Sequence, residues 1–240
     1  MRGAPYGFNL FESCLTCTWR GERFFCNLAP KSLKALDAIA YMNVYPPGAV
    51  LLSEGQQSRG VFLLCRGSAK LSISSGDGKT LITRIAEQGE VLGLTSALSG
   101  NAYKTTAETL EPSQVNFIRR DDFLRFVDQH HDACTNVSKL LTHECELDAD
   151  AIRTLGLSHS AAEKLAHLML SWCDEHGKPA ENGTRVQLLM THEDISQLIG
   201  TSRETVTRLL KEFRSKGILS IHGSNLTVHN RAALEALVLL

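Results

Sequence analysis

The chain has 240 residues, of which 43% are hydrophobic and 21% are charged, and its formal net charge is −1 at neutral pH. This composition is typical of a globular protein with room for two domains. No apolar run approaches the roughly 18 residues of a membrane-spanning helix, and the N-terminal MRGAPYGFNLFES has no signal-peptide core. These features predict a cytoplasmic protein that does not enter a membrane.

The first feature along the chain is the cysteine-containing segment 1–30, with Cys14, Cys17 and Cys26 in CLTCTWRGERFFC. Seven cysteines in a cytosolic chain do not indicate a disulfide framework, and an odd number leaves one thiol unpaired. Thiolates at this spacing suit zinc or an iron–sulfur cluster. A regulatory disulfide, or cysteines that only fill gaps, are the alternatives. The candidates for a fourth ligand are Cys65, Cys134 and Cys145.

Residues 31–130 contain short apolar runs separated by glycines, after a short helix over KSLKALDAIAY. Short strands at such regular spacing predict an antiparallel barrel or roll. The sequence SSGDGK between KLSI and LITRI is typical of a hairpin turn. We therefore expect an antiparallel β-roll in this part of the chain.

A long helix is predicted over 131–156, with apolar residues that fall in one broad stripe when wound at about 100° per residue. The stripe includes Leu140, Leu141, Glu144, Leu147, Asp148 and Ile152, which would form the seam if two copies of the helix meet there. Two carboxylates within a parallel seam would repel their own copies and leave the dimer marginal. The alternative is that they tilt outward and pair with Lys139 or Arg153.

The last domain, 157–240, contains two short helices joined by a glycine. Thr191 is suited to cap the first helix, Gly200 to end it, and Thr201 or Ser202 to cap the second. Basic residues exceed acidic ones by three between 203 and 216, although the whole chain is almost neutral. The positive charge is therefore local, as expected of a DNA-binding element.

The run GTSRETVTRLLKEFRSKGILSIHG resembles the winged helix-turn-helix of the CRP/FNR family of bacterial transcription regulators. The resemblance implies that Arg203, Glu204 and Arg208 read bases, and that Ser202 and Thr205 contact phosphate. Arginine suits the acceptors of guanine, and a carboxylate accepts from cytosine. It further implies a homodimer that binds double-stranded DNA at TGTGA-type half-sites, contacts RNA polymerase and is not an enzyme.

The cysteine segment is similar to that of the FNR branch, in which a cysteine from the sensor domain completes an oxygen-labile [4Fe-4S] cluster. In this chain the strand expected to supply that cysteine reads SQVNFI, with Asn116 and no cysteine. The resemblance implies a sensor of oxygen, nitric oxide or redox state, with zinc or no metal as alternatives.

The glycine-rich region resembles the cyclic-nucleotide-binding roll of the same family. The family's phosphate-binding pairs align with Gly93-Leu94 and Lys104-Thr105, and Glu90 is the substitute for a missing ribose-binding carboxylate. Because lysine does not bind phosphate in the bidentate manner of arginine, cyclic-nucleotide sensing is disfavoured. Control by a small effector in the roll remains an alternative.

The predicted fold is α+β, with a β-roll, a dimerisation helix and a winged helix-turn-helix domain. The competing hypothesis of another class is a metal-binding protein or an enzyme that uses the N-terminal cysteines. The sequence lacks a Walker-type loop, a nucleophile elbow and an H-E-x-x-H motif. The regulator hypothesis is therefore the stronger one.

Overall fold

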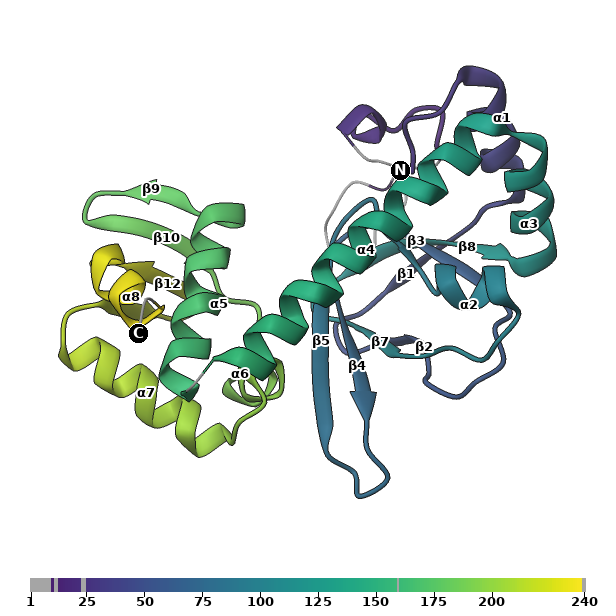
Figure 1. Ribbon diagram of the computed structural model, residues 1–240. Helices are drawn as coiled ribbons and strands as arrows, with labels where there is room; N and C mark the ends of the chain where they lie inside the picture. The colour runs from purple at the N-terminus through teal and green to yellow at the C-terminus, as the bar shows by residue number, and fades with distance from the viewer. Residues whose placement is uncertain (1–9, 11–12, 23–24, 159, 239–240) are drawn as a thin grey trace. The chain divides into compact units, whose positions relative to one another are not determined.

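The computed structural model describes residues 10, 13–22, 25–158 and 160–238, and the chain divides into two compact units, 1–148 and 149–240 (Figure 1). The division falls within helix α4 (His131–Leu157). The helix predicted over 131–156 thus contributes to both units. Among the described residues, no helix has the length and apolar character needed to cross a membrane.

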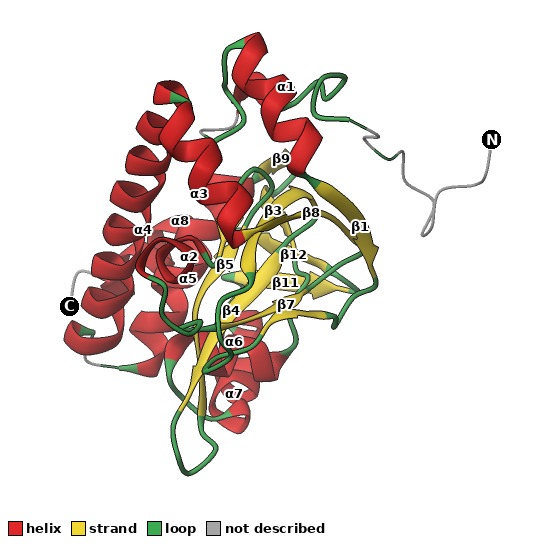
Figure 2. Cartoon of the chain, turned by 90° about the vertical axis from the view of Figure 1, so that its right-hand side faces the viewer, coloured by secondary structure: helices red, strands yellow, loops and turns green. Residues whose placement is uncertain are grey.

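The strands of the first unit form two antiparallel four-stranded sheets, as predicted for a β-roll (Figure 2). Their orders are β1-β8-β3-β6 and β2-β7-β4-β5. The strands are β1 (Tyr41–Tyr45), β2 (Val50–Leu52), β3 (Gly60–Arg66), β4 (Ala69–Ser74), β5 (Thr80–Ala86), β6 (Val91–Leu92), β7 (Thr106–Thr109) and β8 (Ser113–Arg119). Buried side chains of both sheets form one core, which includes Leu52, Leu64, Leu71 and Val115. The predicted hairpin connects β4 to β5.

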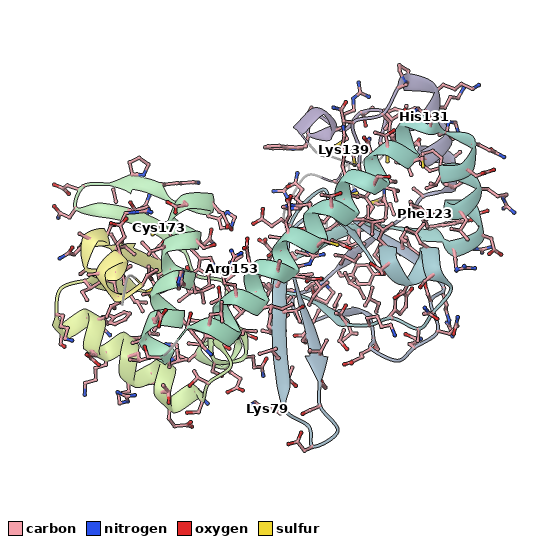
Figure 3. All side chains as sticks on the ribbon, in the orientation of Figure 1. Lys79, Phe123, His131, Lys139, Arg153 and Cys173 are labelled. Atoms are coloured by element: carbon pink, nitrogen blue, oxygen red, sulfur yellow. The ribbon has the colours of Figure 1, made fainter. Side chains whose placement is uncertain are left out.

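Helices cover one side of the roll and form a second core. They are α1 (Pro30–Ile39), α2 (Leu94–Ser99), α3 (Arg120–Gln129) and the first part of α4. Phe25 is fully buried in this core, with its ring 6.0 Å from that of Phe123 and 6.5 Å from that of Phe126; Phe123 is labelled in Figure 3. The Asn136 side chain donates to the Asn27 carbonyl at 3.0 Å. These contacts hold the chain on both sides of Cys26 against the helices.

Helix α4 begins at His131, as predicted. Two of the predicted seam residues, Leu140 and Glu144, face the roll of their own chain. Leu140 is only 4% exposed and belongs to the helix-covered core. The Glu144 carboxylate accepts from Arg84 of β5 at 3.2 Å and from the Thr95 hydroxyl at 3.4 Å. Arg84 also pairs with Glu90. Part of the apolar stripe of α4 is therefore buried against the roll, and only the remainder can contact a second copy.

The partner of Glu144 is not among those predicted from the sequence. The sequence suggested a second copy, Lys139 or Arg153. In the structure Glu144 pairs with Arg84, which lies on strand β5 next to the helix. Arg153, labelled in Figure 3, pairs with Asp150 at 3.0 Å. Helical periodicity identifies the residues that share a face of α4. It does not show what that face contacts, because Arg84 lies 60 positions before Glu144 in the sequence.

The second unit is a winged helix-turn-helix. Its elements are α5 (Ala161–His176), β9 (Lys178–Ala180), β10 (Gly183–Gln187), α6 (His192–Ile199), α7 (Arg203–Ser215), β11 (Leu219–His222), β12 (Asn225–Val228) and α8 (Arg231–Val238). The sheet has the order β11-β12-β10-β9, and β11 and β12 form the wing. A separate core, which includes Met169, Trp172, Ile195 and Phe213, joins the helices to this sheet.

Candidate DNA interface and cysteine pocket

The turn between α6 and α7 is fixed by side-chain caps at both helices. Thr191 and Asp194 form a reciprocal capping box at the start of α6, with the Asp194 amide donating to the Thr191 hydroxyl at 3.1 Å. Gly200 ends α6 in the left-handed conformation, with φ 64°. Ser202 then caps α7 by accepting from the Thr205 amide at 3.2 Å. Of the two predicted caps, Ser202 is the one used.

Helix α7 has one buried and one exposed side. Its inner residues, Val206, Leu209, Leu210 and Phe213, are 0 to 5% exposed. The predicted base-reading residues Arg203, Glu204 and Arg208 are all exposed and lie in its first two turns. The structure therefore brings the three side chains together at the N-terminal end of α7, where a recognition helix meets base edges.

The Glu204 carboxylate is held in its ionised form. Its own backbone N–H and then the Ser202 hydroxyl lower its pKa below the ordinary value, with a further contribution from Arg203. An ionised carboxylate only accepts hydrogen bonds, which suits the amino group of cytosine. The hydroxyls of Ser202 and Thr205 are 3.2 Å apart at the same helix end.

His192, which the sequence did not single out, connects the two helices. Its Nδ1 is 2.9 Å from the hydroxyl of Thr207, and that hydroxyl donates to the Arg203 carbonyl at 2.9 Å. Since a threonine hydroxyl has one proton, Nδ1 of His192 carries the hydrogen of the first bond. Helical spacing shows that Thr207 points outward, but only the fold places His192 beside it.

Four cysteines of the first unit line one small pocket of about 30 Å³. They are Cys14, Cys17 and Cys26 from the N-terminal segment and Cys65 from β3. The turn residues Gln88 and Gly89 complete one side of the pocket. Of the three candidates for a fourth ligand, Cys65 is therefore the one that shares a pocket with the N-terminal cysteines.

Polar contacts anchor the first of these cysteines. The Cys14 amide donates to Asp37 of α1 at 2.6 Å, and the Ser13 hydroxyl donates to the same carboxylate at 3.0 Å. The Asn116 side chain donates to the Cys14 sulfur at 3.6 Å. The Asn116 Oδ1 atom is buried and has no hydrogen-bond partner among the described residues. Asp37 gave no signal in the sequence, because its role depends on where α1 packs.

Cys65 reaches the pocket through an irregularity in the sheet. The register between β3 and β8 shifts between Leu64 and Arg66, so Cys65 is the unpaired residue of a bulge. On β8, Asn116 occupies the position at which the family resemblance led us to expect a cysteine, and it pairs with Leu63. A thiol on β3 thus lies beside the position that lacks one on β8.

Burial makes two of these thiols, Cys14 and Cys65, weaker acids. Desolvation, followed by Asp37 and Cys17, raises the pKa of Cys14 to about 11. Desolvation also raises the pKa of Cys65 well above its ordinary value, with further contributions from Cys26, Cys14 and Cys17. The four groups therefore affect one another electrostatically, and a bound cation would relieve their mutual repulsion as thiolates.

The remaining cysteines lie elsewhere. Cys134 and Cys145 are exposed on α4, and Cys173, labelled in Figure 3, is buried in the core of the second unit. Within the described ranges, no three His, Cys, Asp or Glu side chains already stand at metal-binding spacing. A bound centre would thus draw the four sulfurs of the pocket closer together than they are in this structure.

The four residues assigned to an effector site in the roll have different surroundings. Glu90 pairs with Arg84 and accepts from the Glu87 amide at 2.7 Å. At Gly93, with φ 77°, a Cβ atom would lie 2.8 Å from the Tyr103 ring. Lys104 is exposed and Thr105 is half-buried. None of the four lines the cysteine pocket.

Comparison with known proteins supports both the β-roll and the helix-turn-helix domain. A family model for a cyclic nucleotide-binding domain matches residues 42–130, and one for a Crp-like helix-turn-helix domain matches residues 163–237. The transcriptional activatory protein AadR of Rhodopseudomonas palustris is 27% identical over 221 residues, which cover 92% of this chain and 91% of that protein. The global nitrogen regulator of Synechococcus elongatus is 28% identical over 200 residues, covering 78% and 85%.

Among solved structures, FixK2 from Bradyrhizobium japonicum superposes with a TM-score of 0.72 at 22% sequence identity, covering 83% of this chain and 97% of that one. The fold and the exposed face of α7 define a DNA-binding transcription regulator with a sensor roll. The chain belongs to the CRP/FNR family.

Proposed function

We propose that this regulator acts as a homodimer on TGTGA-type half-sites and that a cysteine-bound iron–sulfur cluster controls its DNA binding. The observation that carries the proposal is the meeting of Cys14, Cys17, Cys26 and Cys65 at one pocket. Four thiols are a complete ligand set for either a [4Fe-4S] cluster or zinc. Three of them belong to one segment of the sequence, and the position of Cys65 in the same pocket supports it as the fourth ligand.

The residues fit such a centre by their chemistry. The four Sγ atoms would be the ligands, and the side-chain N–H of Asn116, which reaches Cys14 at 3.6 Å, would donate to a bound sulfur. A [4Fe-4S] cluster supplies an oxygen- and redox-sensitive group whose loss changes the charge and packing of the pocket. RNA polymerase is the partner we expect for the DNA-bound regulator.

Anaerobic purification tests the cluster. We expect a brown protein that contains iron and acid-labile sulfide and bleaches in air, and we expect Cys65→Ser to lose the colour. Cys134→Ser, which changes an exposed thiol on α4, is the matched control and should keep the cluster. A colourless wild-type sample with zinc or without metal would rule out the iron–sulfur proposal.

Fluorescence anisotropy tests the DNA target. The protein should bind a palindromic TGTGA-type duplex at least about 1,000-fold more tightly than a scrambled duplex at the same salt concentration. Binding that does not distinguish the two duplexes would refute the proposed half-site. Cyclic-nucleotide control is not favoured, because Glu90 is engaged by Arg84 and the lysine at position 104 does not bind phosphate in the bidentate manner of arginine.

A further inference from the structure

Asn116 is a buried polar residue in the wall of the cysteine pocket. It lies on β8, and only 7% of it is exposed. Gln114, two residues earlier on the same strand, points to the same face of the sheet, and both residues line the pocket. Because four thiolates are a complete ligand set without it, the amide of Asn116 in this wall needs a separate explanation.

Only part of that amide has a hydrogen-bond partner. Its Nδ2 atom donates to the Cys14 sulfur at 3.6 Å. Its Oδ1 atom is buried and meets no donor in the part of the chain that the structure describes. A buried acceptor without a partner costs free energy of folding, and a leucine, which has the same branching, would avoid that cost. What leucine could not supply is the N–H group that reaches the sulfur.

Asn116 also acts on a second sulfur, that of Cys65. Burial raises the pKa of this thiol, and a hydrogen bond with the backbone of Asn116 opposes the rise. A hydrogen bond that lowers the pKa of a thiol stabilises its thiolate, so the backbone of Asn116 is the donor. One residue thus donates to thiols from two parts of the chain, Cys14 of the N-terminal segment and Cys65 of β3.

The surroundings strengthen these hydrogen bonds. Leu33, Leu63 and Leu64 line the same pocket and are at most 2% exposed. Apolar walls lower the local dielectric, and a hydrogen bond to a charged sulfur is stronger there than in water. Donors to the ligand atoms of a metal centre orient those ligands, raise the affinity for the metal and shift its reduction potential.

We propose that Asn116 is a positioning residue of the cysteine centre, whose N–H groups donate to the Cys14 and Cys65 sulfurs and stabilise them as ligands of a bound metal. The inference rests on the four-thiol site of the proposed function but not on the identity of the metal. With a cluster, these donors stabilise the reduced form, which carries more negative charge on sulfur, and so raise the reduction potential.

Binding of Co²⁺ to the metal-free, full-length protein under anaerobic conditions tests this role. Asn116→Leu should lower the affinity about 10- to 100-fold and shift the sulfur-to-cobalt absorption band, because it removes a hydrogen bond to a ligand. The unfolding temperature of the metal-free variant should stay the same or rise, since the unpartnered Oδ1 atom is removed as well. A residue that only maintains the fold would not separate affinity from stability in this way.

Two further variants sharpen the test. Asn116→Asp keeps the shape of the side chain but replaces its N–H groups, so it should lose at least as much affinity, and it carries the test if Asn116→Leu does not fold. Asn43→Leu makes the same change at an exposed position of β1, in the same sheet, and is the matched control. In protein that carries a cluster, anaerobic redox titration should give a lower reduction potential for Asn116→Leu.

Four results would overturn the proposal. Wild-type affinity for Co²⁺ in folded Asn116→Leu would show that the amide does not act on the metal site. A loss of affinity together with a lower unfolding temperature of the metal-free protein would mean that Asn116 only maintains the fold. An equal loss in Asn43→Leu would show a general effect of the substitution. A wild type that does not bind Co²⁺ through sulfur would show that the four thiols form no site.

The iron–sulfur proposal fails by a different result. A colourless wild type whose Co²⁺ affinity still depends on Asn116 would exclude the cluster and support the role of Asn116. A brown wild type whose Co²⁺ affinity and reduction potential do not change in Asn116→Leu would exclude only the role of Asn116.

Discussion

At the scale of single residues, sequence recognition is tested by substituting Arg203 and Arg208, which are exposed in the first turns of α7. Arg203→Ala and Arg208→Ala should each cost about 1 to 3 kcal/mol at the cognate site and relax specificity at one base pair, because alanine cannot make the bidentate hydrogen bonds to guanine. Anisotropy against duplexes substituted at single positions measures this. Arg185→Ala, an exposed arginine on β10, should leave specificity unchanged. An equal weakening on every sequence would show that the arginines bind only phosphate.

Ser202 has a role that is independent of DNA. Because its hydroxyl accepts from the Thr205 amide, Ser202→Ala should lower the free energy of unfolding by about 1 kcal/mol, and Ser202→Gly by only a few tenths. Denaturant unfolding without DNA gives both values. If neither substitution lowers the free energy of unfolding, the Ser202 cap contributes nothing to stability.

At the scale of elements, the side chain of Glu144, which joins α4 to the roll through Arg84 and Thr95, predicts a dependence of stability on pH. Burial raises the pKa of Glu144 above its ordinary value of 4.5, although Arg84 opposes the shift. The folded state therefore holds this proton at pH values where the unfolded state has released it. Its contribution to stability is present at low pH and is lost as the pH rises from about 4.5 through the raised pKa.

Glu144→Gln removes that titration. The difference in unfolding free energy between variant and wild type should increase in favour of the variant as the pH rises through this window. Denaturant unfolding at a series of pH values provides the comparison, and Glu146→Gln, on the same helix and exposed, is the control. A difference that does not change with pH would mean that Glu144 titrates normally in the folded protein.

The sequence predicts some of these elements much better than others. Capping residues and helical spacing identify α6 and α7, because both signals are local. The sequence offered Cys65, Cys134 and Cys145 as fourth thiols but could not choose among them, since Cys65 reaches the pocket only through a bulge between two strands. The face of α4 was also ambiguous, because an apolar stripe has the same period whether it packs on a roll or on a second copy.

At the scale of the whole molecule, the structure narrows the surface of α4 that remains for a partner copy. Leu140 and Glu144 are committed to the roll, whereas Ile152 is 71% exposed. An exposed isoleucine on a predicted seam would become buried in a dimer, and burial of such a side chain is worth about 1.5 to 3 kcal/mol. Ile152 is thus the best single position at which to test dimerisation.

Ile152→Glu should weaken the dimer at least about tenfold, since it removes apolar burial and places two like charges at the seam. Sedimentation equilibrium measures the dissociation constant, and affinity for a palindromic duplex should fall in parallel. Arg153→Glu, at an adjacent exposed position that pairs with Asp150, is the control for added negative charge. If both variants dimerise as the wild type does, two copies do not meet at Ile152. If the dimer weakens while palindrome affinity is unchanged, DNA recognition does not require this seam.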